Sequence, residues 1–132
     1  MEDTLSHVMA VWERQRSSSP IYSLLLESIE IYHAEHGIIH ATLPVRALHV
    51  NSKGTLHGTL SACVVDWAAG MAIASTGHQV TGVTKLGDTL EIQGKIGKIG
   101  KTLAFTTITI GKRVEEGIVN VVQGSHTKYI RQ

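Results

Sequence analysis

The chain has 132 residues, of which 42% are hydrophobic and 17% are charged, and its formal net charge at pH 7 is +1. This composition excludes an intrinsically disordered chain, and a charge so close to zero gives no electrostatic reason to expect nucleic-acid binding. The length suits one hydrophobic core. We therefore predict that residues 1–132 form a single domain.

Cys63 is the only cysteine, so an internal disulfide is excluded and a reducing compartment is compatible with the sequence. The acidic residues Glu2 and Asp3 open the chain, and the apolar run of a signal peptide does not follow them. No apolar stretch reaches the length of a transmembrane helix. These features predict a soluble protein of the cytoplasm, with a mitochondrial location as the alternative.

Residues 4–16 predict a short amphipathic helix, because apolar residues recur there at helical spacing and Asp3 or Thr4 can cap its start. Its apolar side carries Leu5, Val8, Met9 and Trp12. The serines at 17–19 and the following Pro20 are expected to end this helix and to begin an irregular link.

Residues 28–34 and 38–45 alternate apolar and polar side chains around a turn at 35–37, which predicts a β-hairpin. The hairpin contains three histidines, but they lack the fixed short spacing and the partner cysteine typical of a zinc site. We therefore predict surface histidines, and neither a metal nor a cofactor. The three residues are His33, His36 and His40.

A long helix is predicted over residues 59–76, where proline is absent, alanine is frequent and apolar residues recur at spacings of three and four. Its expected buried face consists of Leu60, Cys63, Val64, Trp67, Met71 and Ala74. The backbone N–H of Gly58 lies in the first turn, where N–H groups lack helical partners and the helix dipole is positive. Such a position suits an anion or an oxyanion.

Asp66 is the carboxylate of this helix, and its neighbours at three and four positions are apolar or small. Burial of an ionised carboxylate costs several kcal/mol unless the group is paired. Asp66 is therefore either a structural acid, paired or exposed at a gap in the packing, or a functional acid. We interpret Cys63 as a small packed residue, because a nucleophilic cysteine needs a base and an activating field.

Gly58 and Asp66 are eight residues apart, which places their backbones about 12 Å apart along the helix axis at ~1.5 Å per residue. One helix therefore cannot bring both groups to the same reacting atom. If both serve one reaction, a second copy of the helix must run antiparallel, so that Gly58 of one subunit faces Asp66 of the other. A symmetric homodimer provides this arrangement twice.

After the helix, residues 77–84 form a connector. Three strands are then predicted, over residues 89–99, 102–110 and 118–130. Turns are expected at 100–101 and 112–117. The predicted class is α+β, an antiparallel sheet packed on one long helix, and the sequence has neither a Rossmann glycine pattern nor a repeat.

Three short motifs carry a resemblance to a known family. Asn51, the run Gly-Thr-Leu-His57-Gly58 and Asp66 in the following helix resemble the hotdog-fold acyl-CoA thioesterases of the phenylacetate-pathway type. The segments at 100–105 and 122–128 look more specifically like the thioesterase superfamily member 2 group. The similarity extends from the first strand to the end of the chain. It implies a hotdog fold, in which an antiparallel sheet wraps around one long central helix, and a homodimer or homotetramer.

The chain departs from this family at one place. In the family a further strand, on the order of ten residues long, follows the position of Thr84, whereas here Thr84 runs directly into Lys85. That strand ordinarily lies at the sheet edge, joins the two subunits and lines part of the acyl-CoA site. We therefore expect one family strand to be missing, and with it part of the usual dimer contact and of the pocket.

The resemblance implies hydrolysis of an acyl-CoA thioester, for which a protein supplies an oxyanion site and an oriented water. In the family pattern, the Gly58 N–H polarises the carbonyl and the Asn51 side chain holds the loop and the thioester. Asp66 of the partner subunit acts as general base or nucleophile, and Thr84 matches a serine that orients the water. His57 contacts the substrate or fixes the turn. The positions that match coenzyme A contacts are Gly82, Lys85, Lys98, Gly100, Lys101, Thr102 and Leu103.

The residues also leave other functions open. The missing strand is compatible with a catalytically impaired acyl-CoA-binding protein, or with a splice form or gene-model product that does not retain the family function. A hotdog hydratase or dehydratase is a further alternative, although His57 precedes Asp66 by nine residues, a spacing that fits the thioesterase pattern better. The sequence does not define the length or head group of the acyl chain.

Overall fold

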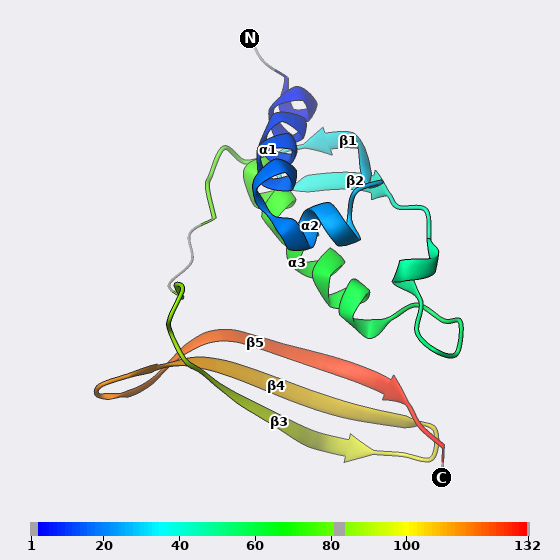
Figure 1. Cartoon of the computed structure of the whole chain (residues 1–132), viewed down its shortest axis with the longest axis vertical. Helices are drawn as coiled ribbons and strands as arrows, with labels where there is room; N and C mark the ends of the chain where they lie inside the picture. Colours follow the sequence, from blue (N-terminus) through cyan, green and yellow to red (C-terminus); the bar gives the residue numbers. More distant parts are fainter. Residues whose placement is uncertain (1–2, 81–83, 132) are drawn as a thin grey trace. The chain divides into compact units, whose positions relative to one another are not determined.

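The computed structural model describes residues 3–80 and 84–131 (Figure 1). The chain divides into two compact units, an N-terminal unit, Met1–Val80, and a C-terminal unit, Thr81–Gln132. The N-terminal unit contains three α-helices and a hairpin, and the C-terminal unit is a three-stranded antiparallel sheet. The predicted α+β class with antiparallel strands is confirmed, while the assignment of the whole chain to one domain stays a prediction.

Helix α1, Thr4–Ser18, confirms the predicted N-terminal helix. Asp3 is its N-cap, and the Asp3 carboxylate accepts a hydrogen bond from the Ser6 backbone N–H at 2.8 Å. This bond satisfies one of the N–H groups that the first turn leaves without a helical partner.

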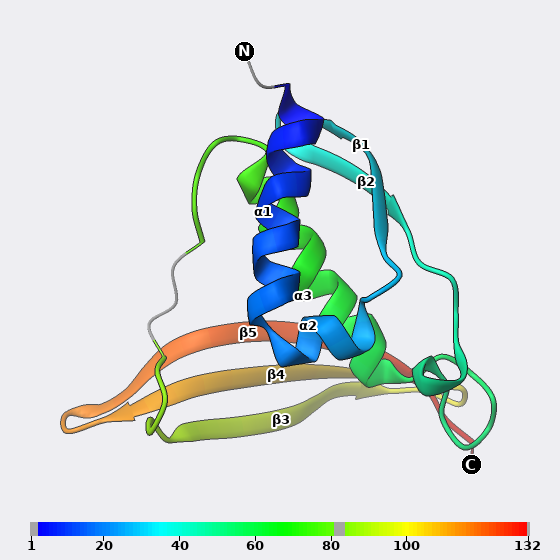
Figure 2. The same ribbon diagram turned by 45° about the horizontal axis from the view of Figure 1, so that its top comes forward.

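A second helix, α2, spans Pro20–Leu25, where an irregular link was predicted (Figure 2). The prediction was wrong because proline was interpreted only as a helix breaker. Pro20 occupies the first turn, where its missing N–H costs no helical hydrogen bond. The Ser19 side chain caps this helix by accepting from the Tyr22 N–H at 3.4 Å.

The predicted hairpin is confirmed as strands β1, Glu30–Glu35, and β2, Ile38–Thr42, which pair antiparallel. Gly37 in the turn has φ +82°, a backbone conformation that favours glycine. Its N–H donates to the Ser75 Oγ at 2.9 Å, just after the end of helix α3. This bond ties the hairpin turn to the end of the long helix.

Helix α3, Gly58–Ala74, confirms the predicted central helix and its inward face. Leu60, Trp67, Met71 and Ala74 are buried, and Cys63 and Val64 are half-buried. Among the residues that the structure describes, no helix is both long enough and apolar enough to span a bilayer.

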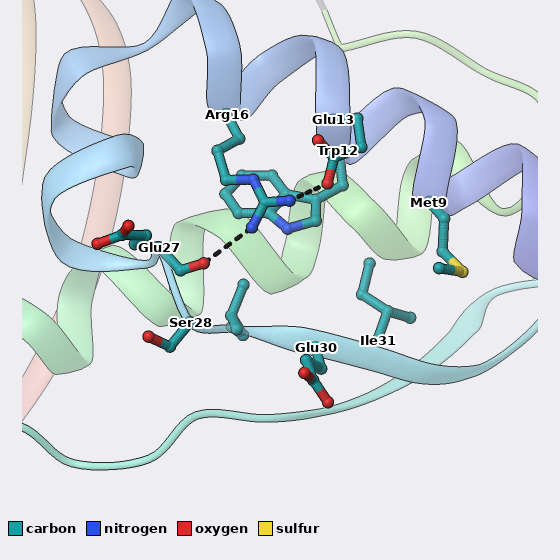
Figure 3. Close-up of a pocket in the computed structure, with 9 residues that line it drawn as sticks. Met9, Trp12, Glu13, Arg16, Glu27, Ser28, Glu30 and Ile31 are labelled. Atoms are coloured by element: carbon teal, nitrogen blue, oxygen red, sulfur yellow. Dashed lines mark hydrogen bonds and ion pairs between the residues drawn. The ribbon is translucent and has the colours of Figure 1, made fainter.

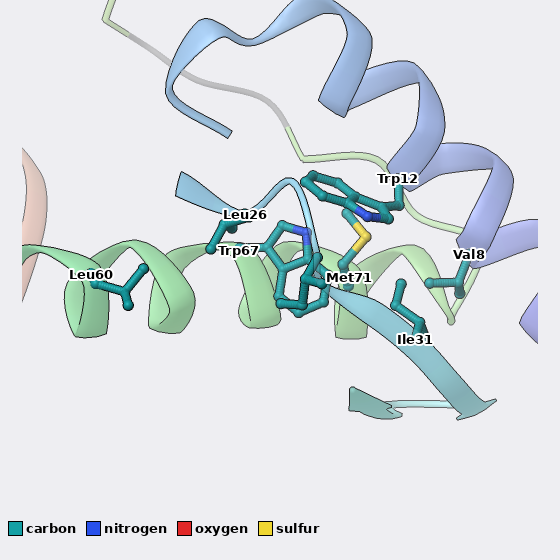
Figure 4. Packing of buried hydrophobic residues seen from close by; sticks show 8 residues of the cluster. Val8, Trp12, Leu26, Ile31, Leu60, Trp67 and Met71 are labelled. Atoms are coloured by element: carbon teal, nitrogen blue, oxygen red, sulfur yellow. The ribbon is translucent and has the colours of Figure 1, made fainter. Parts of the chain in front are cut away.

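The hydrophobic core of the N-terminal unit forms where α1, α3 and β1 meet (Figure 4). The indole rings of Trp12 and Trp67 meet edge to face with centroids 5.4 Å apart, a favourable geometry for aromatic pairs. The buried members of this cluster are Val8, Trp12, Leu26, Ile29, Ile31, Leu60, Trp67 and Met71. Residues of α1, of β1 and of the segment before β1 therefore hold α3 in place.

A buried histidine joins the end of α2 to the segment that leads into α3. His49, in the 3₁₀-helix Ala47–His49, is 1% exposed. Its Nδ1 accepts from the Arg46 N–H at 2.9 Å, and its Nε2 lies 2.8 Å from the Leu25 carbonyl oxygen. These partners assign the ring as neutral with the proton on Nε2, because only a protonated nitrogen donates to a carbonyl.

The C-terminal unit consists of β3, Leu90–Ile99, β4, Leu103–Val114, and β5, Gly117–Tyr129, in the order β3-β4-β5. All three strands were predicted, but the turn expected over residues 112–117 was wrong. The strand β4 continues to Val114, and Lys112 and Arg113 pair with positions on β5. The charged residues suggested an exposed turn. In the structure, Lys112 and Arg113 lie within the strand and form ion pairs with Asp88 and Glu91.

The strands of the described residues form a two-stranded sheet, β1-β2, in the N-terminal unit and a three-stranded sheet, β3-β4-β5, in the C-terminal unit. Residues 75–80 and 84–89, which lie between α3 and β3, contain no strand. This agrees with the expectation that one family strand is missing.

Candidate active site

Asn51 organises the loop that leads into α3. Its side-chain Oδ1 accepts from the Lys53 N–H at 2.9 Å, from the Thr55 N–H at 3.2 Å and from the Thr55 hydroxyl at 3.1 Å. The Asn51 N–H in turn donates to the Thr55 carbonyl at 2.8 Å. Because Oδ1 is used within the loop, the Nδ2 amide group is the part of this side chain that can donate to a ligand.

His57 fixes the start of α3 as its N-cap. Its Nδ1 accepts from the Thr59 N–H at 3.0 Å, and its backbone N–H donates to the His49 carbonyl at 2.8 Å. The imidazole therefore performs the turn-fixing role that was one of its two predicted roles. With Nδ1 as acceptor, Nε2 carries the proton and can donate outward from this exposed side chain.

Gly58 is the first residue of α3, as predicted. None of the described residues accepts a hydrogen bond from its backbone N–H. The helix dipole adds positive potential at this N–H, so the group is suited to bind an oxyanion. Asn51, His57 and Gly58 are thus brought together at one end of α3.

An apolar hollow of about 210 Å³ lies next to this helix start. Its lining consists of Leu25, Leu48, His57, Thr59 and Leu60. Of these residues only His57 was among the predicted binding residues, because Leu25 and Leu48 belong to short helices outside the recognised motif. Leu25 ends α2 and Leu48 lies in the 3₁₀-helix.

Asp66 lies farther along α3, about two helical turns from Gly58, and it is exposed. Of the alternatives that the sequence left open, the structure shows an acid that is both exposed and paired. The Tyr22 hydroxyl donates to the Asp66 Oδ2 at 2.7 Å. Burial and this carboxylate raise the pKa of Tyr22 well above its ordinary value. Tyr22 was not among the predicted site residues, because the helix that carries it was not predicted.

Thr84 and Lys85 belong to the C-terminal unit, whereas the start of α3 belongs to the N-terminal unit. The Thr84 hydroxyl is buried, and none of the described residues is its hydrogen-bond partner. A buried hydroxyl usually has a partner, so this group is suited to hold a water molecule. The Lys85 N–H donates to the Asp88 carboxylate at 2.7 Å, which closes a turn. The predicted contact Gly82 lies outside the described residues.

The remaining predicted contacts lie at the turn between β3 and β4. The Gly100 N–H donates to the Leu103 carbonyl at 2.7 Å, and the Thr102 carbonyl accepts from the Ile130 N–H at 2.8 Å. Lys98, near the end of β3, and Lys101, in the turn, are both exposed. Two cationic side chains on a tight turn with backbone N–H groups can approach phosphate oxygens.

Comparisons with known proteins identify relatives along nearly the whole chain. No protein-family model matches the chain. Human acyl-coenzyme A thioesterase 13 is 30% identical over 141 aligned residues, which cover 98% of this chain and 96% of the human protein. The chain belongs to the hotdog-fold acyl-CoA thioesterase family. The predicted family and fold are therefore confirmed.

Two solved structures of the family resemble this thioesterase-family chain along nearly its whole length. Thioesterase superfamily member 2 from mouse has a TM-score of 0.51 and 28% identity, and the match covers 98% of both chains. The zebrafish protein of the same name has a TM-score of 0.50 and 25% identity, over 98% of this chain and 99% of its own.

The human alignment extends over 141 residues, more than the 132 residues of this family member. The human protein therefore has residues without a counterpart here. That the missing segment follows Thr84 stays a prediction.

A pocket beside α1 is not part of the predicted site of this family member. This cavity of about 330 Å³ lies between α1 and β1 (Figure 3). Arg16 lies over the Trp12 ring at 5.5 Å, donates to the Glu27 carbonyl at 2.8 Å and forms an ion pair with Glu13. None of the predicted site residues lines it.

We predict that Cys63 is dispensable for catalysis. It lies on α3, three residues before Asp66. Burial and the Asp66 charge raise the pKa of the Cys63 thiol, so little nucleophilic thiolate is present at neutral pH. We expect Cys63→Ala to keep the turnover of an acyl-CoA within about twofold, and the native thiol to react slowly with iodoacetamide at pH 7. A loss of turnover larger than tenfold in the folded variant would contradict this.

Proposed function

We propose that this chain hydrolyses acyl-CoA thioesters to a free carboxylic acid and coenzyme A. The observation that carries the proposal is its relation to human acyl-coenzyme A thioesterase 13 along nearly the whole chain. The start of α3 supports it, because Gly58 offers an N–H without an acceptor among the described residues at the positive end of a helix dipole. Fatty acyl-CoA substrates would place the enzyme in lipid metabolism.

In this mechanism, the thioester carbonyl oxygen accepts from the Gly58 N–H. The Nδ2 group of Asn51 is positioned to hold the thioester, since Oδ1 is engaged within the loop. The hollow beside His57 would receive an apolar part of the substrate, because three leucines line it. Charge that develops on the oxygen in the transition state is stabilised by these donors.

Asp66 is proposed as the general base. Its carboxylate removes a proton from water while the water oxygen bonds to the thioester carbon, and Thr84 orients this water. The carbon–sulfur bond then breaks, and the proton passes to the coenzyme A thiolate. Direct attack by the Asp66 carboxylate would instead form an anhydride that water opens in a second step.

The proposal includes a homodimer or homotetramer in which residues 1–132 act as one hotdog domain. Gly58 and Asp66 lie on the same helix, about 12 Å apart along its axis, so one substrate carbonyl cannot meet both within one chain. An antiparallel second copy places the partner subunit's Asp66 opposite Gly58. We further propose a location in the cytoplasm, with mitochondria as the alternative.

Coenzyme A is proposed to bind along the turn between β3 and β4 and near Lys85, with Gly82 as a further contact. Lys98 and Lys101 would meet its phosphates. We expect the double variant Lys98→Gln, Lys101→Gln to raise KM for acyl-CoA by about tenfold with little change in kcat, because each exposed charge pair contributes up to about 1 kcal/mol. Added salt should raise the KM of the unmodified protein in the same direction.

Lys95→Gln is the matched control, since Lys95 is exposed on β3 but lies away from the turn. Its KM should stay within about twofold. Equal KM values for the double variant and this control would contradict the assignment of the turn to coenzyme A.

The function itself is tested by measuring the release of free thiol from a series of acyl-CoAs with short, medium, long and aryl acyl groups. The oligomeric mass is measured on the same sample. We expect thiol release from a dimer or tetramer. Binding of coenzyme A without any thiol release would contradict hydrolysis in favour of an acyl-CoA-binding protein. Addition of water to an enoyl-CoA without thiol release would indicate a hydratase.

A further inference from the structure

The Tyr22–Asp66 hydrogen bond joins two elements of the N-terminal unit. Tyr22 lies on α2 and Asp66 on α3, 44 residues later, and the Tyr22 hydroxyl lies 2.7 Å from the Asp66 Oδ2. The two helices lie next to each other in both views of the chain (Figures 1 and 2). The contact is therefore a tertiary one, set by how α2 packs.

The position of the Tyr22 ring is fixed by its surroundings. The ring meets the Trp12 indole edge to face at 5.7 Å, and Trp12 meets Trp67 in the same manner at 5.4 Å. Trp67 is the residue that follows Asp66 on α3. Since Trp12 and Trp67 are 3% and 2% exposed, the phenol is held by core rings that also fix the helix carrying the carboxylate.

The hydrogen bond engages only one oxygen of the carboxylate. Tyr22 donates to Oδ2, and no described residue donates to Oδ1. The Asp66 side chain is exposed, so without a partner it would sample several rotamers in water. The phenol therefore fixes the direction of the carboxylate and leaves its other oxygen accessible.

We propose that Tyr22 is a positioning residue for catalysis, which holds the Asp66 carboxylate through Oδ2 so that Oδ1 is directed at the attacking water. This inference rests on the proposed function. Correct orientation of a general base contributes to the rate only when the transition state forms, so its loss should appear in kcat and not in KM. Burial and Asp66 raise the pKa of Tyr22, so the phenol stays a hydrogen-bond donor at neutral pH.

Tyr22→Phe removes the hydroxyl and keeps the ring that packs on Trp12. We expect kcat for acyl-CoA hydrolysis to fall by about tenfold, the lower end for the loss of a hydrogen bond to a charged group, with KM within about twofold. Tyr32→Phe is the matched control, because Tyr32 is 60% exposed on β1 and its ring contacts His40. It should keep both constants within about twofold. Near-ultraviolet circular dichroism and thermal unfolding confirm that each variant is folded.

A double-mutant cycle separates positioning from a general effect on the fold. If Tyr22 acts through Asp66, Tyr22→Phe should lower the residual rate of the Asp66→Asn variant by less than about twofold. A purely structural role predicts the same factor in both backgrounds.

The outcomes distinguish this inference from the proposed function. A tenfold loss in kcat with an unchanged KM, absent in the Asp66→Asn background, supports it. Unchanged or increased kcat in Tyr22→Phe, a change in KM alone, or additive losses overturn it while the hydrolytic function stands. Absence of thiol release from the unmodified protein overturns the proposed function, and the role of Tyr22 with it.

Discussion

Asp66→Asn is expected to lower kcat for acyl-CoA hydrolysis by about 10²- to 10⁴-fold, the usual contribution of a general base. Asparagine has nearly the same size and keeps an oxygen that can accept from the Tyr22 hydroxyl, but it does not take up a proton from water. Because the side chain is exposed, the fold should be unaffected. The measurement is thiol release at saturating acyl-CoA.

Asp3→Asn is the control for this change. Asp3 caps α1 in the same unit, and asparagine is an equally good N-cap, so both stability and turnover should be preserved. Equal turnover in Asp66→Asn and in the unmodified protein would exclude Asp66 as the base. Membership of the family would be unaffected by that result.

Trp67→Ala is expected to lower the free energy of unfolding of the N-terminal unit by about 3–5 kcal/mol, the range for the loss of a large buried aromatic side chain. Trp67 is 2% exposed and lies edge to face against Trp12. Such a loss is a large part of the ~5–15 kcal/mol by which domains are stable. Denaturant unfolding followed by far-ultraviolet circular dichroism measures it.

Val65→Ala provides the comparison on the same helix. Val65 is 70% exposed, and an exposed substitution of this kind usually changes stability by no more than about 0.5 kcal/mol. If both variants unfold at the same denaturant concentration, Trp67 does not belong to the core that holds α3.

Elements long enough to show a repeated pattern of apolar residues were predictable from the sequence. The central helix and its inward residues were found because Leu60, Trp67 and Met71 all pack on one side of it. Helix α2 was missed because six residues are too few to show a helical period. The length of β4 was missed because Lys112 and Arg113 satisfy their charges with acidic residues before and on β3, in pairs that the local sequence does not reveal.

The site was predictable only where its residues are close in sequence. Asn51, His57 and Gly58 fall within one loop and one helix start, so their motif places them together. The Tyr22–Asp66 contact depends on the packing of two helices across 44 residues. No periodicity or motif reports such a contact.

The two bonds of the His49 imidazole have a consequence for how substitutions act at a distance. One ring nitrogen faces the carbonyl at the end of α2, and the other receives the Arg46 N–H before the loop that presents Asn51. The His49 side chain thus connects the helix that carries Tyr22 to the loop that carries the proposed oxyanion donors. We therefore expect a replacement of His49 to affect both substrate binding by the loop and the orientation of the Asp66 carboxylate. The His49 ring itself contacts neither Asn51 nor Asp66.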